Sequence, residues 1–238
     1  MPLSNWKAFV LNHCSSLAQW ALPASCVLCG TGAAQDNFCA PCKAALPHLC
    51  RARCEVCALP LTSGTLCGAC LKQPPAYDKV CVQHAYAFPL DALIRAYKYG
   101  GDLALAHVLA DQMPGAAAPA VDALIPMPLA HARLRERGFN QALELARVIG
   151  RRLGVPILAD ACRKVVDTAP QAALPWSQRA RNVRGVFVCD AELGGLRVAV
   201  VDDVMTTGAT LNELARNLKR AGALHVSGWM LARTLPAI

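Results

Sequence analysis

The feature that most constrains this 238-residue chain is a doubled cysteine pattern within its first seventy residues. The spacing C-x2-C-x9-C-x2-C occurs twice, and the second copy lies 28 residues after the first. Thiolates three residues apart on a tight turn can face one ion, and two such turns complete the tetrahedral four-sulfur site of structural zinc. The sequence therefore predicts two zinc ions, with sequential or interleaved pairing of the four turns. The predicted ligands are Cys26, Cys29, Cys39, Cys42, Cys54, Cys57, Cys67 and Cys70.

Five further cysteines fall outside the repeat, and the regular offset of the eight others argues against a disulfide framework. We expect these five to be buried thiols, with His48 as a less favoured alternative zinc ligand. They are Cys14, Cys50, Cys81, Cys162 and Cys189. The apolar stretch from Trp6 to Leu22 is interrupted by polar residues, and it is too short to span a bilayer. It is interpreted as an amphipathic helix on a cytoplasmic protein, whose thiols stay reduced.

Strands and helices are predicted to alternate beyond the Pro74-Pro75 dipeptide. The predicted strands span residues 79–88, 121–126, 196–201 and 226–232, and the predicted helices span 90–99, 103–113, 139–153 and 210–221. This alternation predicts an α/β fold with a mostly parallel sheet and helices on both faces. The expected organisation is an N-terminal helix over 1–22, a double zinc ribbon over 23–74 and an α/β domain over 75–238.

The segment from Val198 to Thr210 combines an apolar strand, two carboxylates and a hydroxyl-rich turn that opens a helix. Ligands of open α/β sheets bind beyond the carboxyl ends of the strands. The turn offers backbone N–H groups, a helix dipole and threonine hydroxyls to a phosphate, whereas Asp202 and Asp203 can accept hydrogen bonds from sugar hydroxyls. The segment therefore predicts a site for a ribose 5-phosphate; the alternative is that Asp203 or Thr207 only caps the helix.

Positive charge is concentrated between residues 131 and 184. The whole chain carries a net charge of +8, and this segment holds eleven Arg and Lys residues against four acids. The eleven are Arg133, Arg135, Arg137, Arg147, Arg151, Arg152, Arg163, Lys164, Arg179, Arg181 and Arg184. Such a segment favours a phosphate-bearing molecule or a nucleic acid, and a solvated helix face is the alternative. Arg147, Arg151 and Arg152 are expected to project to solvent as a basic strip.

Two resemblances follow from these motifs. The stretch from Asp202 to Thr210 resembles the signature with which type I phosphoribosyltransferases bind phosphoribosyl diphosphate (PRPP). The chain as a whole resembles the competence protein F (ComF) family, which places a double zinc ribbon ahead of a type I phosphoribosyltransferase fold. The matching segments are 125–129, Arg133, the Arg-Gly-Phe-Asn-Gln run at 137–141, Thr168 with Gln171, and Arg179 with Asn182.

The PRPP resemblance implies a role for each segment. Asp202 and Asp203 would hold the ribose hydroxyls at the catalytic centre, and Thr206, Thr207, Gly208, Ala209 and Thr210 would bind the 5-phosphate. The loop after Pro126 would hold the diphosphate with Mg²⁺, with Arg133 and Arg137 as further contacts. Residues 164–178 would form a mobile loop to which Lys164 or Arg163 supplies a catalytic cation.

The ComF resemblance implies a role in DNA uptake during competence. The protein would act on the cytoplasmic side, with single-stranded DNA and the uptake machinery as partners and no membrane span. The alternatives are a metabolic phosphoribosyltransferase that acts on a nucleobase or amine, and a non-catalytic regulator that senses PRPP and binds nucleic acid. Because few residues follow the last predicted strand, the cover of the acceptor pocket is expected from residues 75–100, including Tyr97, Lys98 and Tyr99, or from the zinc ribbons.

Overall fold

The computed structural model describes residues 25–33, 37–115, 118–166 and 185–236. The chain forms two compact units, Met1–Leu46 and Pro47–Ile238. The first unit contains the first cysteine repeat and helix α2 (Ala40–Ala44), and the second unit contains the second repeat and helix α3 (Gly68–Lys72). The predicted N-terminal helix over 1–22 lies outside the described residues. Among the helices that are described, none is long and apolar enough to cross a membrane.

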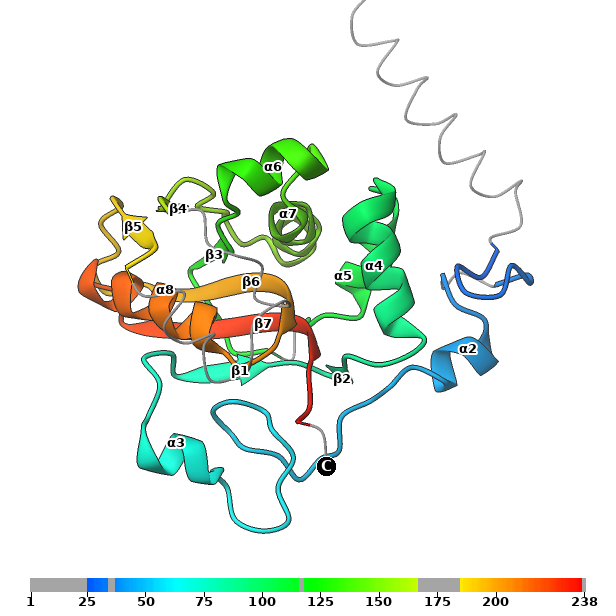
Figure 1. The fold of residues 1–238 in the computed structure, drawn as a ribbon, viewed down its shortest axis with the longest axis horizontal. Coiled ribbons are helices and arrows are strands. Elements are labelled where there is room, and N and C mark those ends of the chain that lie inside the picture. Colours follow the sequence, from blue (N-terminus) through cyan, green and yellow to red (C-terminus); the bar gives the residue numbers. More distant parts are fainter. Residues whose placement is uncertain (1–24, 34–36, 116–117, 167–184, 237–238) are drawn as a thin grey trace, which may run out of the picture. The chain divides into compact units, whose positions relative to one another are not determined.

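A parallel sheet forms the centre of the second unit, as the alternating pattern predicts (Figure 1). The strand order is β1-β7-β6-β3, and β2 pairs with β7 farther along that strand. The strands are β1 (Lys79–Cys81), β2 (His84–Ala85), β3 (Ala123–Pro126), β6 (Arg197–Met205) and β7 (His225–Arg233). The segment 79–88 thus contributes two short strands rather than one long strand, and the long apolar β6 and β7 lie at the centre.

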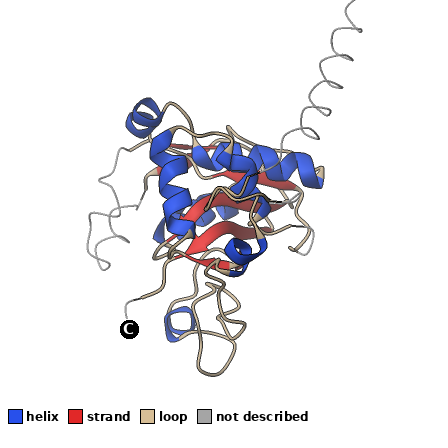
Figure 2. Cartoon of the chain, turned by 90° about the vertical axis from the view of Figure 1, so that its right-hand side faces the viewer, coloured by secondary structure: helices blue, strands red, loops and turns tan. Residues whose placement is uncertain are grey.

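Helices cover both faces of this sheet. The helices of the second unit, besides α3, are α4 (Leu90–Gly100), α5 (Leu105–Asp111), α6 (His131–Arg137), α7 (Gln141–Leu153) and α8 (Ala209–Arg220). Val198 and Val200 of β6 share a buried cluster with Leu214 of α8, whereas the alternate residues Ala199 and Val201 are buried on the other face. Helix α7 packs against β3 and β6, and Figures 1 and 2 show the strands lying between helical layers and the second cysteine repeat.

Helix α6 and strands β4 and β5 are among the elements that were not predicted from the sequence. Helix α6 buries no side chain and is largely charged, so it carries no apolar stripe that would indicate a helix. Strands β4 (Cys162–Lys164) and β5 (Phe187–Cys189) form a separate antiparallel pair. Cys162 and Cys189 lie opposite each other in this pair and form a disulfide, with their Cα atoms 4.2 Å apart. The expectation that these two residues are reduced thiols is therefore wrong, because strand pairing brings together residues that are 27 positions apart.

Candidate functional site

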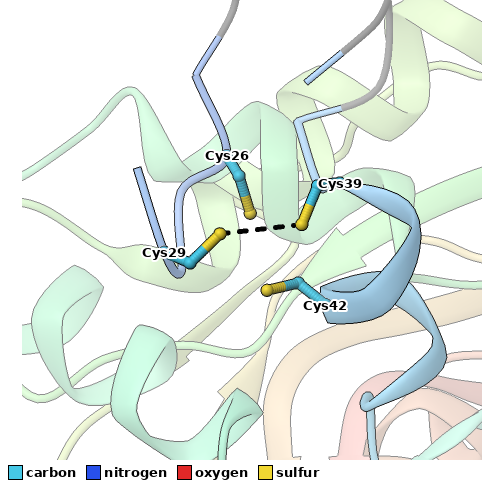
Figure 3. Close-up of side chains that lie close together, drawn as sticks. All are labelled: Cys26, Cys29, Cys39 and Cys42. Atoms are coloured by element: carbon cyan, nitrogen blue, oxygen red, sulfur yellow. Dashed lines mark hydrogen bonds between the residues drawn. The ribbon is translucent and has the colours of Figure 1, made fainter. Parts of the chain in front are cut away.

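The eight predicted zinc ligands form two separate clusters of four sulfur atoms, paired sequentially rather than interleaved. Within each cluster the sulfur atoms all lie within 4.8 Å of one another. The Sγ atoms of Cys29 and Cys39 are 3.6 Å apart, and those of Cys57 and Cys67 are 3.5 Å apart. Zn–S bonds of about 2.3 Å place tetrahedral sulfurs about 3.8 Å apart, so both clusters fit a structural zinc ion. Figure 3 shows the sulfur atoms of the first cluster pointing toward one another.

The two clusters repeat the same backbone geometry. In the first cluster the N–H of Gly30 donates to the carbonyl of Cys26 at 2.8 Å, and in the second the N–H of Ala58 donates to that of Cys54 at 2.9 Å. The turn requires a left-handed residue, with φ of +74° at Gly30 and +60° at Ala58. Each repeat then ends in a one-turn helix that follows its third cysteine. The sequence repeat is therefore a repeat of structure.

The surroundings of the clusters differ. In the first cluster Cys26 is buried but Cys29 is exposed. In the second, Cys54, Cys57 and Cys70 belong to the hydrophobic core that also contains residues of the central sheet. Backbone N–H donors, chiefly that of Cys39, lower the pKa of Cys26 to about 6. Burial raises the pKa of Cys54, but backbone donors outweigh it and leave that pKa at about 7. These two shifts favour the thiolate, which is the form that binds zinc, whereas burial raises the pKa of the neighbouring ligand Cys57 to about 11.

The cysteines outside the two clusters have other surroundings. Cys50 is exposed and Cys81 is partly buried, so neither matches the expected fully buried thiol. His48 is not placed in either group of four ligands, and its ring lies 4.7 Å from that of His84 instead. Cys14 lies outside the described residues. The zinc sites of the described chain are thus built from the repeat cysteines alone.

The two acidic residues lie within β6, near its carboxyl end, rather than after it. The Asp203 carboxylate is almost fully buried, with 3% of the residue exposed. Its Oδ1 accepts a hydrogen bond of 2.6 Å from the N–H of Val204. Its Oδ2 lies 2.8 Å from the Nζ of Lys98, which extends from α4. Asp203 is therefore paired and buried, whereas the predicted binding of ribose hydroxyls by the two carboxylates stays a prediction.

Asp202 faces a different environment from its neighbour. Its Oδ1 accepts a hydrogen bond of 2.9 Å from the N–H of Asp203, and the residue is partly exposed. Burial, together with the negative charge of Asp203, raises the pKa of Asp202 to about 7. Lys98 has the opposite balance: burial lowers its pKa, but the charge of Asp203 outweighs burial and raises that pKa above its ordinary value. Lys98, expected near the acceptor pocket, thus becomes the counter-ion of the acid pair.

The turn after β6 is tight and contains a left-handed glycine. Gly208 precedes α8 with a φ of +83°, and a Cβ built there would lie 2.5 Å from the Cε of Met205. Only glycine fits this position without a shift of its neighbours. The Oγ1 of Thr207 accepts a hydrogen bond of 3.2 Å from the N–H of Ala209, but the N-cap of α8 is Gly208 and no side chain caps this helix. A small pocket of about 30 Å³ opens here, lined in part by Asp202, Thr206 and Thr210.

Arg137, the first residue of the Arg-Gly-Phe-Asn-Gln run, lies near the acid pair. Its guanidinium is 5.2 Å from the centre of the Tyr99 ring. Its positive charge partly opposes the rise in the pKa of both Lys98 and Asp202. The Nε of Arg137 is buried without a hydrogen-bond partner among the described residues. Arg137 is therefore a cation with unused donor capacity at the edge of the site.

The rest of this run builds the connection between α6 and α7. Gly138 ends α6 with a φ of +78°, and Asn140 caps α7 by accepting a hydrogen bond of 3.0 Å from the N–H of Ala142. The side-chain amide of Asn140 also donates to the carbonyl of Met127 at 3.2 Å. Tyr97 donates to the carbonyl of Gln141 at 3.0 Å. The run thus fixes the loop after β3 and the position of Arg137.

Other predicted site residues lie in different settings. Arg133 forms an ion pair with Glu136 on its own helix, at 3.3 Å. Lys164 lies in β4, opposite Phe187 in the register of the β4–β5 pair. Arg163, the alternative cation, forms an ion pair with Asp190 at 3.0 Å. The predicted mobile loop lies mostly outside the described residues, as do Thr168, Gln171, Arg179, Arg181, Asn182 and Arg184. The roles of Arg133 and Lys164 stay predictions.

The three arginines expected to form a basic strip on α7 are exposed, but two of them are paired with carboxylates. Arg147 forms an ion pair with Glu144 at 2.6 Å, and Arg152 forms one with Asp111 of α5 at 3.2 Å. The Nε of Arg151 donates to a backbone carbonyl within α7. These arginines are exposed, but carboxylates offset two of the three charges. The structure thus supports a solvated helix face more than a strong anion-binding surface.

Comparison with known proteins gives two kinds of match. Residues 17–89 match the double zinc ribbon domain family. Competence protein F of Haemophilus influenzae is 36% identical over 178 residues, covering 70% of this chain and 78% of that protein. DNA utilization protein YhgH of Escherichia coli is 33% identical over 227 residues, covering 90% of this chain and 99% of that protein. The chain belongs to the ComF family.

The comparisons also include matches of lower identity. Competence protein ComFC of Bacillus subtilis is 23% identical, covering 88% of this chain and 95% of that protein. Among solved structures, glutamine PRPP amidotransferase of B. subtilis aligns with a TM-score of 0.35 and 22% identity, over 55% of this chain and 26% of that one. Purine phosphoribosyltransferase of Pyrococcus horikoshii aligns with a TM-score of 0.29 and 24% identity, over 57% and 72%. The parallel α/β sheet and the two cysteine clusters confirm the fold predicted for a ComF protein.

Proposed function

We propose that this ComF protein binds Mg–PRPP at the carboxyl edge of β6 and transfers its phosphoribosyl group to an acceptor. The observation that carries the proposal is that an acid, a left-handed glycine turn and a helix start follow one another at the end of β6, close to two cations. Asp202 is followed within a few residues by the left-handed Gly208 and the start of α8, while Lys98 and Arg137 supply positive charge from other elements. Carboxylates suit ribose hydroxyls, and a helix start suits a phosphate.

The chain's own residues have distinct parts in this proposal. The Asp202 carboxylate accepts hydrogen bonds from the ribose hydroxyls, because it is the more accessible of the two acids. The backbone N–H groups of the Thr206–Thr210 turn receive the 5-phosphate, aided by the dipole of α8. Arg137, whose buried Nε has no partner among the described residues, donates to the diphosphate. Mg²⁺ arrives as part of the substrate, with the diphosphate.

The ion pair between Lys98 and Asp203 explains how an anionic substrate can approach two adjacent acids. PRPP is a polyanion, and two free carboxylates would repel it. Lys98 compensates the charge of Asp203 at 2.8 Å, which leaves one carboxylate for the ribose. As the bond between the ribose C1 and the diphosphate breaks, positive charge develops on the sugar. The nearby carboxylates stabilise that charge, and Arg137 stabilises the departing diphosphate.

The experiment that tests this proposal is titration calorimetry with Mg–PRPP. The double variant Asp202→Asn/Asp203→Asn removes both carboxylates, and we expect each charge-assisted hydrogen bond that Asp202 loses to the ribose to cost about 1.5–3 kcal/mol of binding. Asp111→Asn is the control, because Asp111 is an exposed acid on α5 paired with Arg152. Equal affinity of the wild type and the double variant would refute the site. Release of diphosphate on addition of candidate bases or single-stranded DNA would then identify the acceptor.

A DNA-linked role on the cytoplasmic side is our proposal for its biological context. The relatives named as competence and DNA utilization proteins support it. Single-stranded DNA and the uptake machinery are the proposed partners, with a metabolic transferase or a PRPP-sensing regulator as the alternatives. Filter binding over a range of salt concentrations tests it, since each neutralised phosphate contributes a slope of about −0.7 in log affinity for single strands. No affinity for single-stranded DNA at low salt would favour the metabolic transferase.

A further inference from the structure

Arg233, at the end of β7, is an almost fully buried arginine that joins two distant parts of the second unit. Only 1% of the residue is exposed. Its Nε donates to the backbone carbonyl of Cys57, a ligand of the second cysteine cluster, at 3.1 Å. Its Nη1 donates to the carbonyl of Met205 at 3.1 Å and also to that of Thr206. One guanidinium therefore holds the second zinc turn and the beginning of the proposed phosphate loop.

The positive charge of Arg233 has no carboxylate partner among the described residues. Among the ion pairs of the described residues, none involves this guanidinium, although a buried cation needs a compensating charge. The nearby groups that can carry negative charge are the side chains of Cys57, Tyr77 and Cys67, and a bound zinc ion would hold the two cysteines as thiolates. A zinc ion with four thiolates keeps a net negative charge, so a filled second cluster matches Arg233 electrostatically. The electrostatic environment of Arg233 therefore depends on whether the second cluster holds zinc.

The bonds from Arg233 also fix the direction of the loop amides. A trans peptide unit is planar, so its C=O and N–H point in opposite directions. When the carbonyls of Met205 and Thr206 turn toward Arg233, the N–H groups of Thr206 and Thr207 must turn away from it. These are the first two N–H groups of the turn that we propose for the 5-phosphate. Arg233 therefore orients the donors without touching the substrate.

The segment between the second cysteine cluster and β1 also contacts the turn after β6 and helix α8. Tyr77 belongs to the same hydrophobic cluster as Cys54 and Cys57, and its hydroxyl lies 3.1 Å from the position that a Cβ on Gly208 would occupy. Directly before it, the N–H of Ala76 donates to the side-chain carbonyl of Asn212 in α8 at 2.7 Å. The segment that leaves the second cluster is therefore packed against the glycine of the phosphate loop.

We propose that Arg233 is a positioning residue through which zinc at the second cysteine cluster, and not at the first, sets the affinity of the loop for Mg–PRPP. The inference rests on the proposed PRPP function. If the coupling exists it is reciprocal, so bound PRPP must also stabilise zinc at the second cluster. The first cluster lies in the other compact unit and serves as an internal control.

The test measures zinc release to a chromophoric chelator from the full chain, with and without Mg–PRPP. The variant Cys26→Ser/Cys29→Ser removes the first site, so that released zinc comes from the second cluster. We expect Mg–PRPP to slow this release about fivefold or more, the lower range of ordinary coupling. The zinc that the wild type releases in addition to this comes from the first cluster, and its release should not respond to Mg–PRPP. PRPP binding by the wild type with no effect on zinc release from the second cluster would overturn the inference.

Variants of Arg233 separate positioning from mere stability. Arg233→Met should weaken Mg–PRPP binding about tenfold and abolish the effect of PRPP on zinc release, and Arg233→Lys should restore part of both. Arg197→Met, at an exposed position on the adjacent strand, is the control. Unchanged PRPP affinity in a folded, zinc-loaded Arg233→Met protein would contradict the inference; if that variant does not fold, the zinc-release experiment with arginine in place still decides. Failure of the wild type to bind PRPP would instead refute the proposed function, and this inference with it.

Discussion

The two cysteine clusters share one motif and one backbone geometry but lie in different surroundings. The first belongs to a small unit of its own, and its Cys29 is exposed. The second belongs to the main hydrophobic core, beneath the sheet that carries the acid pair. Arg233 then links its turn to the loop after β6. The comparison shows that a repeated metal motif can belong to a separate module in one copy and to the main hydrophobic core in the other.

The largest expected effect comes from removing one ligand from each cluster. Cys57→Ser should cost the second unit at least about 4 kcal/mol of unfolding free energy, because structural zinc binding is coupled to folding and this cluster is part of the core. Cys29→Ser should leave that unit almost unchanged. Denaturant melts followed by tryptophan fluorescence measure the difference, since Trp229 of β7 is buried in the second unit. Equal destabilisation by the two substitutions would show that the clusters are equivalent.

The next largest expected effect is a pH dependence of the unfolding free energy caused by Asp202. This residue belongs to the acid pair of the second unit. Its raised pKa of about 7 means that the folded protein holds a proton which the unfolded chain, with an ordinary aspartate, releases near pH 4. The wild type should therefore lose stability as the pH rises from about 4 to about 7. Asp202→Asn should remove this loss and be more stable by about 1–2 kcal/mol near pH 7. Melts between pH 5.5 and pH 7.5 measure it, and a constant difference between the two proteins would contradict it.

The smallest effect concerns the left-handed residue of each turn. Gly30→Ala should weaken zinc binding at the first cluster about tenfold, because the left-handed conformation costs alanine about 1–2 kcal/mol. The space itself is open, since a Cβ at Gly30 meets no atom within 4 Å. Ala58→Gly should be nearly neutral, because relief of the same strain is offset by loss of a buried methyl group worth about 0.8 kcal/mol. Competition with a metal indicator measures both affinities. A large loss on Ala58→Gly would mean that packing, not conformation, controls that turn.

Local patterns explain which parts could be predicted from the sequence. Cysteine spacing specified both zinc sites, and the apolar runs of β6 and β7 specified the centre of the parallel sheet. The sequence could not distinguish sequential from interleaved pairing of the four cysteine turns, because the spacing fits both. Helix α6 was missed because it buries nothing, and the β4–β5 pair was missed because its strands are only three residues long.

Local sequence patterns also explain which part of the candidate site could be predicted. The acids and the turn after β6 are contiguous in sequence, so their association was visible. The partner of Asp203 is Lys98, more than a hundred residues earlier, and the partners of Arg233 come from three separate segments. The only available signals were a lysine within the expected cover segment and an arginine ending the last apolar strand. Long-range pairing of buried charges depends on the fold and leaves little trace in local sequence.

The most direct test of the account is hydrogen–deuterium exchange of the full chain with and without Mg–PRPP. Amides that bind a phosphate are protected from exchange, so we expect Mg–PRPP to slow exchange at residues 206–210 and at the second zinc turn around Cys57. The turn around Cys29 in the first cluster should exchange at the same rate in both states. Protection confined to the first cluster, or no protection at residues 206–210 under saturating Mg–PRPP, would contradict the account.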